Sequence, residues 1–125
     1  MDNAIQVEHL DFSYGPVTVL ENASLSIGER EFICVVGPNG GGKTTLLKLM
    51  LGLLQPKQGT VRILGQPPQK GRQWVGYLPQ HAQLEASFPV TVIDVVLMGR
   101  LGKTRGFGFY TRQDRTRAGD ALEHV

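Results

Sequence analysis

The chain has 125 residues, of which 41% are hydrophobic and 19% are charged, so its length predicts at most a single domain and its composition excludes wholesale disorder. Thirteen Lys and Arg residues against eleven Asp and Glu residues give a formal net charge of +2, which is too small to indicate nucleic acid or anionic lipid as the main partner. Glycine is over-represented, because it supplies 16 of the 125 residues against a usual share of about 7%.

The sequence disfavours secretion and membrane insertion. The chain opens with Asp2 and Asn3 rather than with a basic stretch and an apolar run, and Cys34 has no partner for an internal disulfide. The longest apolar stretch, 90–98, contains Asp94 and falls well short of the roughly 20 residues that a membrane helix needs. We therefore expect the chain neither to be secreted nor to cross a bilayer by itself.

The first 30 residues have the pattern of short strands. Apolar residues alternate imperfectly with polar ones, and Gly15 and Pro16 mark a turn. The predicted strands are 5–12, 17–20 and 23–27.

The middle of the chain has the order strand, glycine loop, helix. Residues 31–36 are almost continuously apolar, which predicts a strand buried on both faces as in a parallel sheet, with Cys34 as a small core residue. After the glycines, four apolar residues recur at the spacing of one helix face, and we predict that Pro56 stops this helix. These four residues are Leu46, Leu49, Met50 and Leu53.

The rest of the chain predicts further strands and helices. Thr91 has the character of a helix N-cap, with Asp94 three residues later as an acidic variant of the capping box, and predicts a helix at 92–98. The other predicted elements are strands at 60–64 and 74–78 with a Pro- and Gly-bearing segment at 65–71 between them, a loop at 99–110, and a helix at 113–125 that reaches the last residue.

The glycine loop matches the pattern G-x-x-x-x-G-K-[ST], which binds phosphate. The matching residues are Gly37, Pro38, Asn39, Gly40, Gly41, Gly42, Lys43 and Thr44, and Thr45 follows. Glycines let the backbone curl so that N–H groups converge on an anion, and the following helix adds its own unpaired N–H groups and the positive end of its dipole. Lys43 supplies a charge that reaches the β and γ phosphates, and the Thr44 hydroxyl is placed to bind Mg²⁺.

A glycine-rich turn that merely joins a strand to a helix is the competing interpretation. The motif follows a strand of the buried type and opens an amphipathic helix, which is the context that phosphate binding requires. We therefore interpret residues 37–45 as a phosphate-binding loop.

Three motifs resemble those of one family. GPNGGGKTTLLKLMLGLL (37–54) resembles the Walker A segment of the ATP-binding subunits of ABC transporters, and YLPQ (77–80) resembles the Q-loop that follows it at this spacing. DFSYG (11–15) resembles the A-loop of the same family. Gly41 departs from the pattern, because many relatives have Ser or Ala there. Since a further glycine keeps the N–H donor, we expect binding to survive.

The resemblance implies a role for each matching residue. Tyr14 would stack on the adenine ring, Lys43 and Gln80 would be the catalytic residues, and Thr44 and Gln80 would hold Mg²⁺. Taken alone, Tyr14 is equally compatible with an aromatic residue at a strand end, and Gln80 with an ordinary turn residue after Pro79. The residues implied to contact ATP are Tyr14, Gly37, Pro38, Asn39, Gly40, Gly41, Gly42, Lys43, Thr44 and Thr45.

The fold implied is the α/β P-loop NTPase fold of the ABC ATPase type. It comprises an antiparallel β portion at 1–30, a truncated parallel core sheet with the P-loop and Q-loop at 31–80, and the start of a helical subdomain at 81–125. The 125 residues would thus form the N-terminal portion of one ATP-binding domain. No LSGGQ-type segment and no apolar strand ending in Asp-Glu occur in them, so we expect the chain alone to bind ATP without hydrolysing it.

Two later segments, FPVTVIDVVLMGRLGK (88–103) and GFGFYTRQDR (106–115), most resemble the subunits that energise zinc or manganese import. The implied partners are a membrane-spanning permease, a second ATP-binding subunit in a homodimer and, indirectly, a periplasmic or surface metal-binding protein, with no nucleic acid. The implied location is cytoplasmic, peripheral on the inner face of the cell membrane. A nucleotide-binding fragment without hydrolysis and a soluble ABC protein without a transport role stay open as alternatives.

Overall fold

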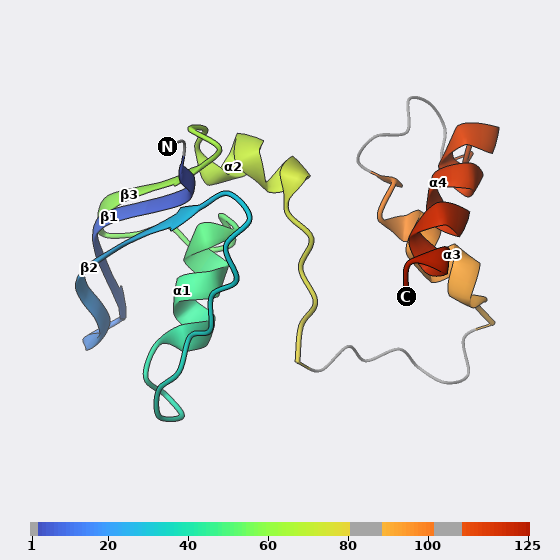
Figure 1. The fold of residues 1–125 in the computed structure, drawn as a ribbon. Helices are drawn as coiled ribbons and strands as arrows, with labels where there is room; N and C mark the ends of the chain where they lie inside the picture. Colours follow the sequence, from blue (N-terminus) through green and yellow to red (C-terminus); the bar gives the residue numbers. More distant parts are fainter. Residues whose placement is uncertain (1–2, 81–88, 102–108) are drawn as a thin grey trace. The chain divides into compact units, whose positions relative to one another are not determined.

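The computed structural model describes residues 3–80, 89–101 and 109–125. These residues belong to two compact units, Met1–Val75 and Gly76–Val125. The first unit contains β1 (Asn3–Tyr14), β2 (Val17–Gly28), α1 (Lys43–Met50), β3 (Gln58–Ile63), α2 (Pro68–Gly71) and the 3₁₀ helix Arg72–Trp74 (Figure 1). The second unit contains α3 (Val92–Met98) and α4 (Arg112–Glu123).

The strands of the first unit form one antiparallel sheet in the order β2-β1-β3. The strand predicted at 5–12 is confirmed as part of β1, and the two strands predicted at 17–20 and 23–27 are one continuous strand, β2. The register of β1 with β2 shifts between Val7 and Leu10, where His9 has a φ of 47°. This bulge returns Leu10 to the face that buries Val7, which explains the imperfect alternation of the sequence.

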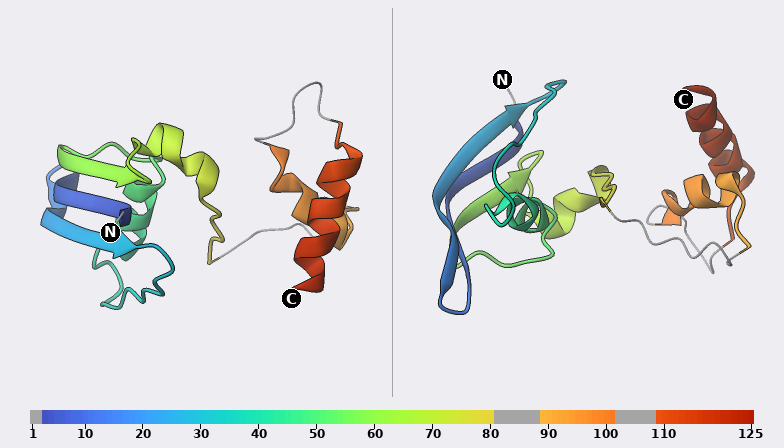
Figure 2. Two further views of the ribbon diagram at one scale, coloured as in Figure 1. Left: turned by 45° about the horizontal axis from the view of Figure 1, so that its top comes forward. Right: turned by 90° about the horizontal axis from the view of Figure 1, so that it is seen from below.

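The core of the first unit lies between the sheet and α1, which covers one face of it (Figure 2). Leu10 and Leu49 have exposed fractions of 0% and 1%, so strand and helix exclude water from each other's apolar face. The core cluster consists of Val7, Leu10, Phe12, Leu46, Leu49, Met50 and Val61. The helix face predicted from Leu46, Leu49 and Met50 is therefore confirmed.

The end of α1 was predicted wrongly. The helix stops at Met50 rather than continuing to Pro56, because Gly52 takes a left-handed conformation with a φ of 68°. The N–H of Gly52 donates to the carbonyl of Leu49 at 3.0 Å and that of Leu53 donates to the carbonyl of Lys48 at 2.9 Å, which is the Schellman arrangement of a helix end. Leu53 therefore leaves the helix face and is 58% exposed.

Residues 31–36 do not form the buried strand that their apolar sequence predicts. No strand is assigned to this segment, and Phe32 and Val36 are 96% and 83% exposed. Cys34 is exposed as well, so its prediction as a core residue is also wrong. A strand needs neighbours for its hydrogen bonds, and within the described residues the sheet contains only the three antiparallel strands, none of which pairs with 31–36.

The strand predicted at 74–78 is also absent from the structure. Pro68 starts α2 within the segment predicted to separate two strands, and the chain continues through the 3₁₀ helix to Trp74. Residues 75–78 then have no regular structure and no strand partner among the described residues. The strand predicted at 60–64 is confirmed, with bounds of 58–63.

In the second unit, α3 and α4 begin in the same way. The capping box predicted for Thr91 and Asp94 is confirmed, and Thr111 with Asp114 forms a second one that the sequence analysis missed. The helix predicted at 113–125 is confirmed as α4, but it ends at Glu123 with His124 as its C-cap rather than at the last residue. The loop predicted at 99–110 lies largely outside the described residues. Among the described residues, no helix has the length and apolarity needed to span a membrane.

Candidate nucleotide-binding site

The predicted phosphate loop leads directly into α1. Gly42 is the N-cap of the helix, and no side chain caps this end of the helix. The N–H of Leu46 makes a helical bond to the carbonyl of Gly42 at 2.8 Å, whereas the N–H groups that precede it in the first turn have no acceptor within a helix. These donors and the helix dipole therefore face the exposed loop at 37–41, which is the arrangement that binds an anion.

Gly42 is fixed by its backbone and by its neighbours. Its φ is 91°, a left-handed conformation. A Cβ there would lie 3.1 Å from the side chains of both Val19 and Leu20 and 3.2 Å from the Val19 carbonyl oxygen. Strand β2 thus packs directly on the point where the loop becomes a helix, and only glycine fits there without displacement.

The ammonium group of Lys43 spans the start of the loop. Its Nζ donates to the carbonyl oxygens of Gly37 at 2.6 Å and of Pro38 at 2.7 Å. The N–H of Gly41 donates to the same Pro38 carbonyl at 3.0 Å, and a Cβ on Gly41 would lie 2.9 Å from that oxygen. The glycine at this position therefore permits a tighter loop than Ser or Ala would.

Tyr14, predicted from the sequence as an adenine-stacking residue, lies beside the helix that follows the loop. Its hydroxyl accepts a hydrogen bond from Thr45 Oγ1 at 3.4 Å. Its ring makes an edge-to-face contact with Phe12, with a centroid separation of 4.9 Å. The bond between Tyr14 and Thr45 therefore brings the A-loop and P-loop residues together. Thr45 is buried, Thr44 is exposed, and Tyr14 is 48% exposed.

Residues 20–125 match the profile of the ABC transporter family. The chain belongs to this family. The strand, glycine loop and helix predicted around Lys43 lie within the matched range, and so do Tyr77 and Gln80 of the predicted Q-loop. Tyr14 precedes it.

Several relatives in the ABC family are metal transport subunits. The zinc transport system ATP-binding protein TroB of Treponema pallidum is 40% identical over 98% of this chain and 46% of that protein. The high-affinity zinc uptake system ATP-binding protein ZnuC of Bacillus subtilis is 37% identical over 98% of this chain and 54% of that protein. The chain thus spans about half the length of these curated relatives.

A solved ABC structure has the same fold as this chain. It is an inward-facing conformation of a metal-chelate type ABC transporter, 29% identical, with a TM-score of 0.78 over 99% of this chain and 45% of the other. The ABC ATPase fold that the motifs implied is therefore confirmed. The truncated parallel core sheet predicted within 31–80 is wrong for the described residues, because their sheet contains antiparallel pairs only.

Gln80, the predicted Q-loop residue of this ABC chain, belongs to the second unit and is exposed at a bend. The first unit therefore contains both Tyr14 and the P-loop, and the second unit contains Gln80. Among the described residues, no cluster of His, Cys, Asp and Glu could hold a metal ion.

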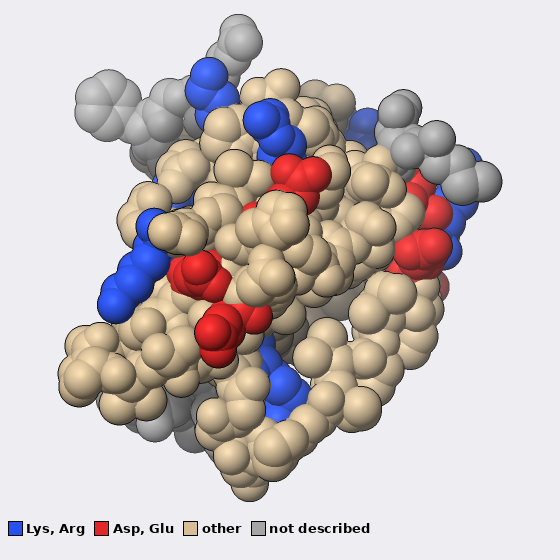
Figure 3. Space-filling view, turned by 90° about the vertical axis from the view of Figure 1, so that its left-hand side faces the viewer, with Lys and Arg blue, Asp and Glu red and all other residues tan. Residues whose placement is uncertain are grey.

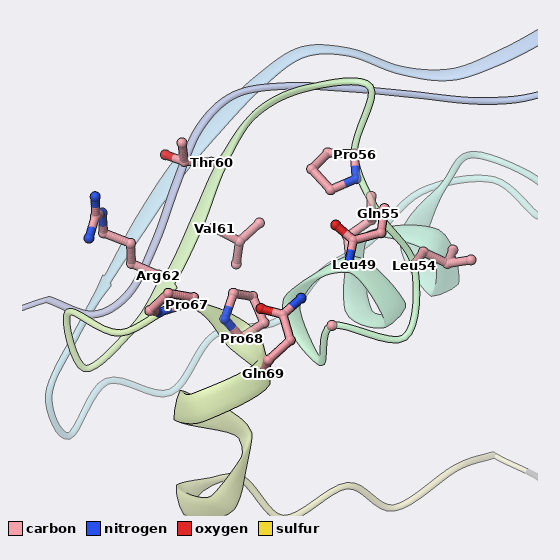
Figure 4. A pocket seen from close by; sticks show the side chains of 11 residues that line it. Leu49, Leu54, Gln55, Pro56, Thr60, Val61, Arg62, Pro67, Pro68 and Gln69 are labelled. Atoms are coloured by element: carbon pink, nitrogen blue, oxygen red, sulfur yellow. The ribbon is translucent and has the colours of Figure 1, made fainter.

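Two hollows in the first unit lie away from the P-loop. Leu49, Val61 and Pro68 contribute to the wall of one, whose volume is about 230 Å³ (Figure 4). The other has a volume of about 280 Å³, and Asp11, Glu21 and Lys57 contribute to its lining. On the face of the molecule seen in Figure 3, acidic and basic side chains are interspersed. The predicted phosphate-binding residues of this ABC chain therefore form an exposed loop and a helix end, and neither hollow is lined by them.

Sequence reasoning found the loop of the ABC family but missed its support. Val19 and Leu20 pack against Gly42 and lie in none of the three motifs. Phe12 lies in DFSYG, but its edge-to-face contact with Tyr14 was not predicted. Their apolar character in the strands was visible, but which residues of a hairpin meet a loop depends on the register of the sheet and on the packing of the helix.

Proposed function

We propose that the chain binds Mg·ATP at residues 37–45, as the N-terminal portion of an ABC ATPase subunit that energises import of zinc or manganese. The observation that carries the proposal is the geometry at Lys43, because an open helix N-terminus, a curled glycine loop and an ammonium held by two loop carbonyls converge there. The zinc relatives TroB and ZnuC support the choice of cargo.

The residues present fit a bound magnesium nucleotide. The first-turn N–H groups of α1 would bind phosphate oxygens, and Lys43 Nζ would exchange its bonds to the carbonyls of Gly37 and Pro38 for bonds to the β and γ phosphates. The Thr44 hydroxyl, which is exposed, and the Gln80 side-chain oxygen are ligand types that suit Mg²⁺. When bound, the ion neutralises charge on the phosphates.

The proposed assembly follows the family. The complete subunit would pair with a second copy and with a membrane-spanning permease, at the cytoplasmic face of the membrane, and a metal-binding protein outside would deliver the cargo. These 125 residues contain neither an LSGGQ-type segment nor an apolar strand ending in Asp-Glu, so we propose that they bind ATP without turnover.

Calorimetry of Mg·ATP binding tests the site. Lys43→Ala should weaken binding about 10- to 100-fold, because it removes charge-assisted hydrogen bonds to phosphate. Lys48→Ala is the matched control, since Lys48 lies in the last turn of the same helix and should leave the affinity within about twofold. Equal affinities for the wild type and Lys43→Ala would refute the site, and phosphate release sensitive to Lys43→Ala would refute the absence of turnover.

The proposed cargo is tested in cells that lack the gene for the complete subunit, since the 125 residues alone are proposed to bind ATP without turnover. Restoring the wild-type gene should raise cellular zinc or manganese, measured by mass spectrometry, whereas a gene carrying Lys43→Ala should not. If neither metal responds to the wild-type gene while ATP binding is intact, the chain belongs to an ABC protein with another role.

A further inference from the structure

The side chain of Thr45 links the phosphate-binding helix to the predicted base-binding residue. Thr45 is the third residue of α1 and is 7% exposed. A threonine hydroxyl in a helix often bonds back to a carbonyl of the preceding turn, but here Oγ1 donates outward to the phenol oxygen of Tyr14 at 3.4 Å. Thr45 thus has its backbone N–H in the first turn of the helix, where phosphate is proposed to bind, and its hydroxyl bonded to the phenol oxygen of Tyr14.

Phe12 restricts the Tyr14 ring from a second side. The two rings are nearly perpendicular, at 85°, and Phe12 is itself in the core cluster with Leu46 and Leu49 of α1. An edge-to-face pair occupies at most one face of either ring. Because Tyr14 is 48% exposed, it keeps apolar ring surface available for stacking.

The end of the β1–β2 hairpin is also fixed to the phosphate loop. Val19 and Leu20 approach Gly42 so closely that a Cβ on it would lie 3.1 Å from each side chain. Tyr14 lies on the opposite strand of this hairpin end, paired with Val17. The separation between the ring and the loop is therefore set by packing, by an aromatic contact and by one hydrogen bond.

We infer that Thr45 is a positioning residue that holds the Tyr14 ring where it stacks on the base of a nucleotide whose phosphates lie at residues 37–45. The inference rests on the proposed function and adds a role for one hydroxyl to it: the site binds a nucleoside triphosphate more tightly than a bare triphosphate, and the Thr45 hydroxyl contributes to that difference. Stacking of a base on an aromatic side chain is strong enough to change affinity about tenfold.

The experiment compares two probes, Mg·ATP and magnesium tripolyphosphate, by calorimetry on the 125-residue chain. The measured quantity is the ratio of the two affinities. Tyr14→Ala should lower this ratio about tenfold, because the stacking surface is gone. Thr45→Val and Tyr14→Phe should each lower it about threefold, since each removes one half of the hydroxyl pair and keeps the packing. The double variant should lose no more than either single one.

Two further variants separate positioning from general damage to the fold. Thr45→Ser keeps a hydroxyl donor and should retain the wild-type ratio. Ser13→Ala removes a hydroxyl that contacts Thr18 at 3.5 Å in the same hairpin end and should also retain it. Circular dichroism spectra are compared for every variant. If either Thr45→Val or Tyr14→Phe does not match the spectrum of the wild type, the other of these two variants is used to test the hydroxyl pair.

The outcomes distinguish this inference from the proposed function. If the wild-type chain binds neither probe, the proposed phosphate site fails and the inference fails with it. If both probes bind with equal affinity, the phosphate site stands and the inference is overturned. A lower ratio in Tyr14→Ala with unchanged ratios in Thr45→Val and Tyr14→Phe would show that the ring stacks without help from Thr45, which also overturns it.

Discussion

Arg100 donates a hydrogen bond from its Nε to Oδ1 of Asp114 at 2.8 Å, and this ion pair joins the end of α3 to the start of α4. The other carboxylate oxygen of Asp114 accepts from the N–H of Thr111 at 2.9 Å and from its hydroxyl at 2.8 Å. One carboxylate, on a side chain that is 5% exposed, therefore caps α4 and holds the two helices together. Asp94 caps α3 with the same geometry.

We expect Asp114 to make the second unit sensitive to acid. The bond from the Thr111 backbone, then those from Arg100 and the Thr111 hydroxyl, hold the pKa of Asp114 below its usual value. Because the folded pKa lies below the unfolded one, the stabilisation is complete above about pH 4 and is lost as the pH falls through the folded pKa. Bonds from the Thr91 hydroxyl and backbone lower the pKa of Asp94 in the same way.

Asp114→Asn tests this role. The variant leaves the Arg100 guanidinium without its charged partner, so amide hydrogen exchange in 112–123 should be faster at neutral pH while exchange in β1 is unchanged. Its helical circular dichroism should also vary less between pH 5 and pH 2 than that of the wild type. Asp120→Asn, on an exposed side of the same helix, is the control. Equal exchange in the two variants would contradict the role.

Gly42 and Gly40 offer a matched comparison within the phosphate loop. Both have left-handed backbones, with φ values of 91° and 78°, but a Cβ on Gly42 would meet Val19 and Leu20 at 3.1 Å, whereas a Cβ on Gly40 would meet no atom within 4 Å. An alanine at either site carries a backbone strain of about 1–3 kcal/mol, and only Gly42→Ala adds about 1–3 kcal/mol of overpacking.

Gly42→Ala should therefore lower the free energy of unfolding of the first unit more than Gly40→Ala does, and it should weaken Mg·ATP binding because the helix N-terminus is displaced. Urea unfolding and calorimetry measure the two effects. The packing argument is wrong if the two variants unfold at the same urea concentration.

What the sequence predicted well depends on local chemistry. The glycine at the start of α1, the Thr91 capping box and the buried face of α1 are each determined by residues within one or two turns of one another, so their patterns can be recognised without the fold. The match to the ABC transporter family over 20–125 confirms the conclusion that the motifs carried.

The errors came from elements that depend on distant partners. Residues 31–36 are apolar enough for a buried strand, but hydrogen bonding within the described sheet offers that segment no neighbour, and Phe32 and Val36 stay exposed. The segment predicted as a strand at 74–78 likewise has no neighbouring strand among the described residues, and its first residue belongs to the 3₁₀ helix. Periodicity reports which face of an element is apolar, and it does not report whether another strand lies beside it.

The end of α1 was misjudged for a different reason, and a pair of leucines tests the corrected boundary. Leu49 is 1% exposed in the core, and Leu53, four residues later on the same predicted face, is 58% exposed because the chain turns at Gly52. Because the helix ends at Met50 and the chain turns at Gly52, Leu49→Ala should lower the free energy of unfolding by about 2–5 kcal/mol through cavity formation. Leu53→Ala should change it by no more than about 0.5 kcal/mol. A helix that continued to Pro56 would bury both residues, and comparable losses in urea unfolding would support that boundary instead.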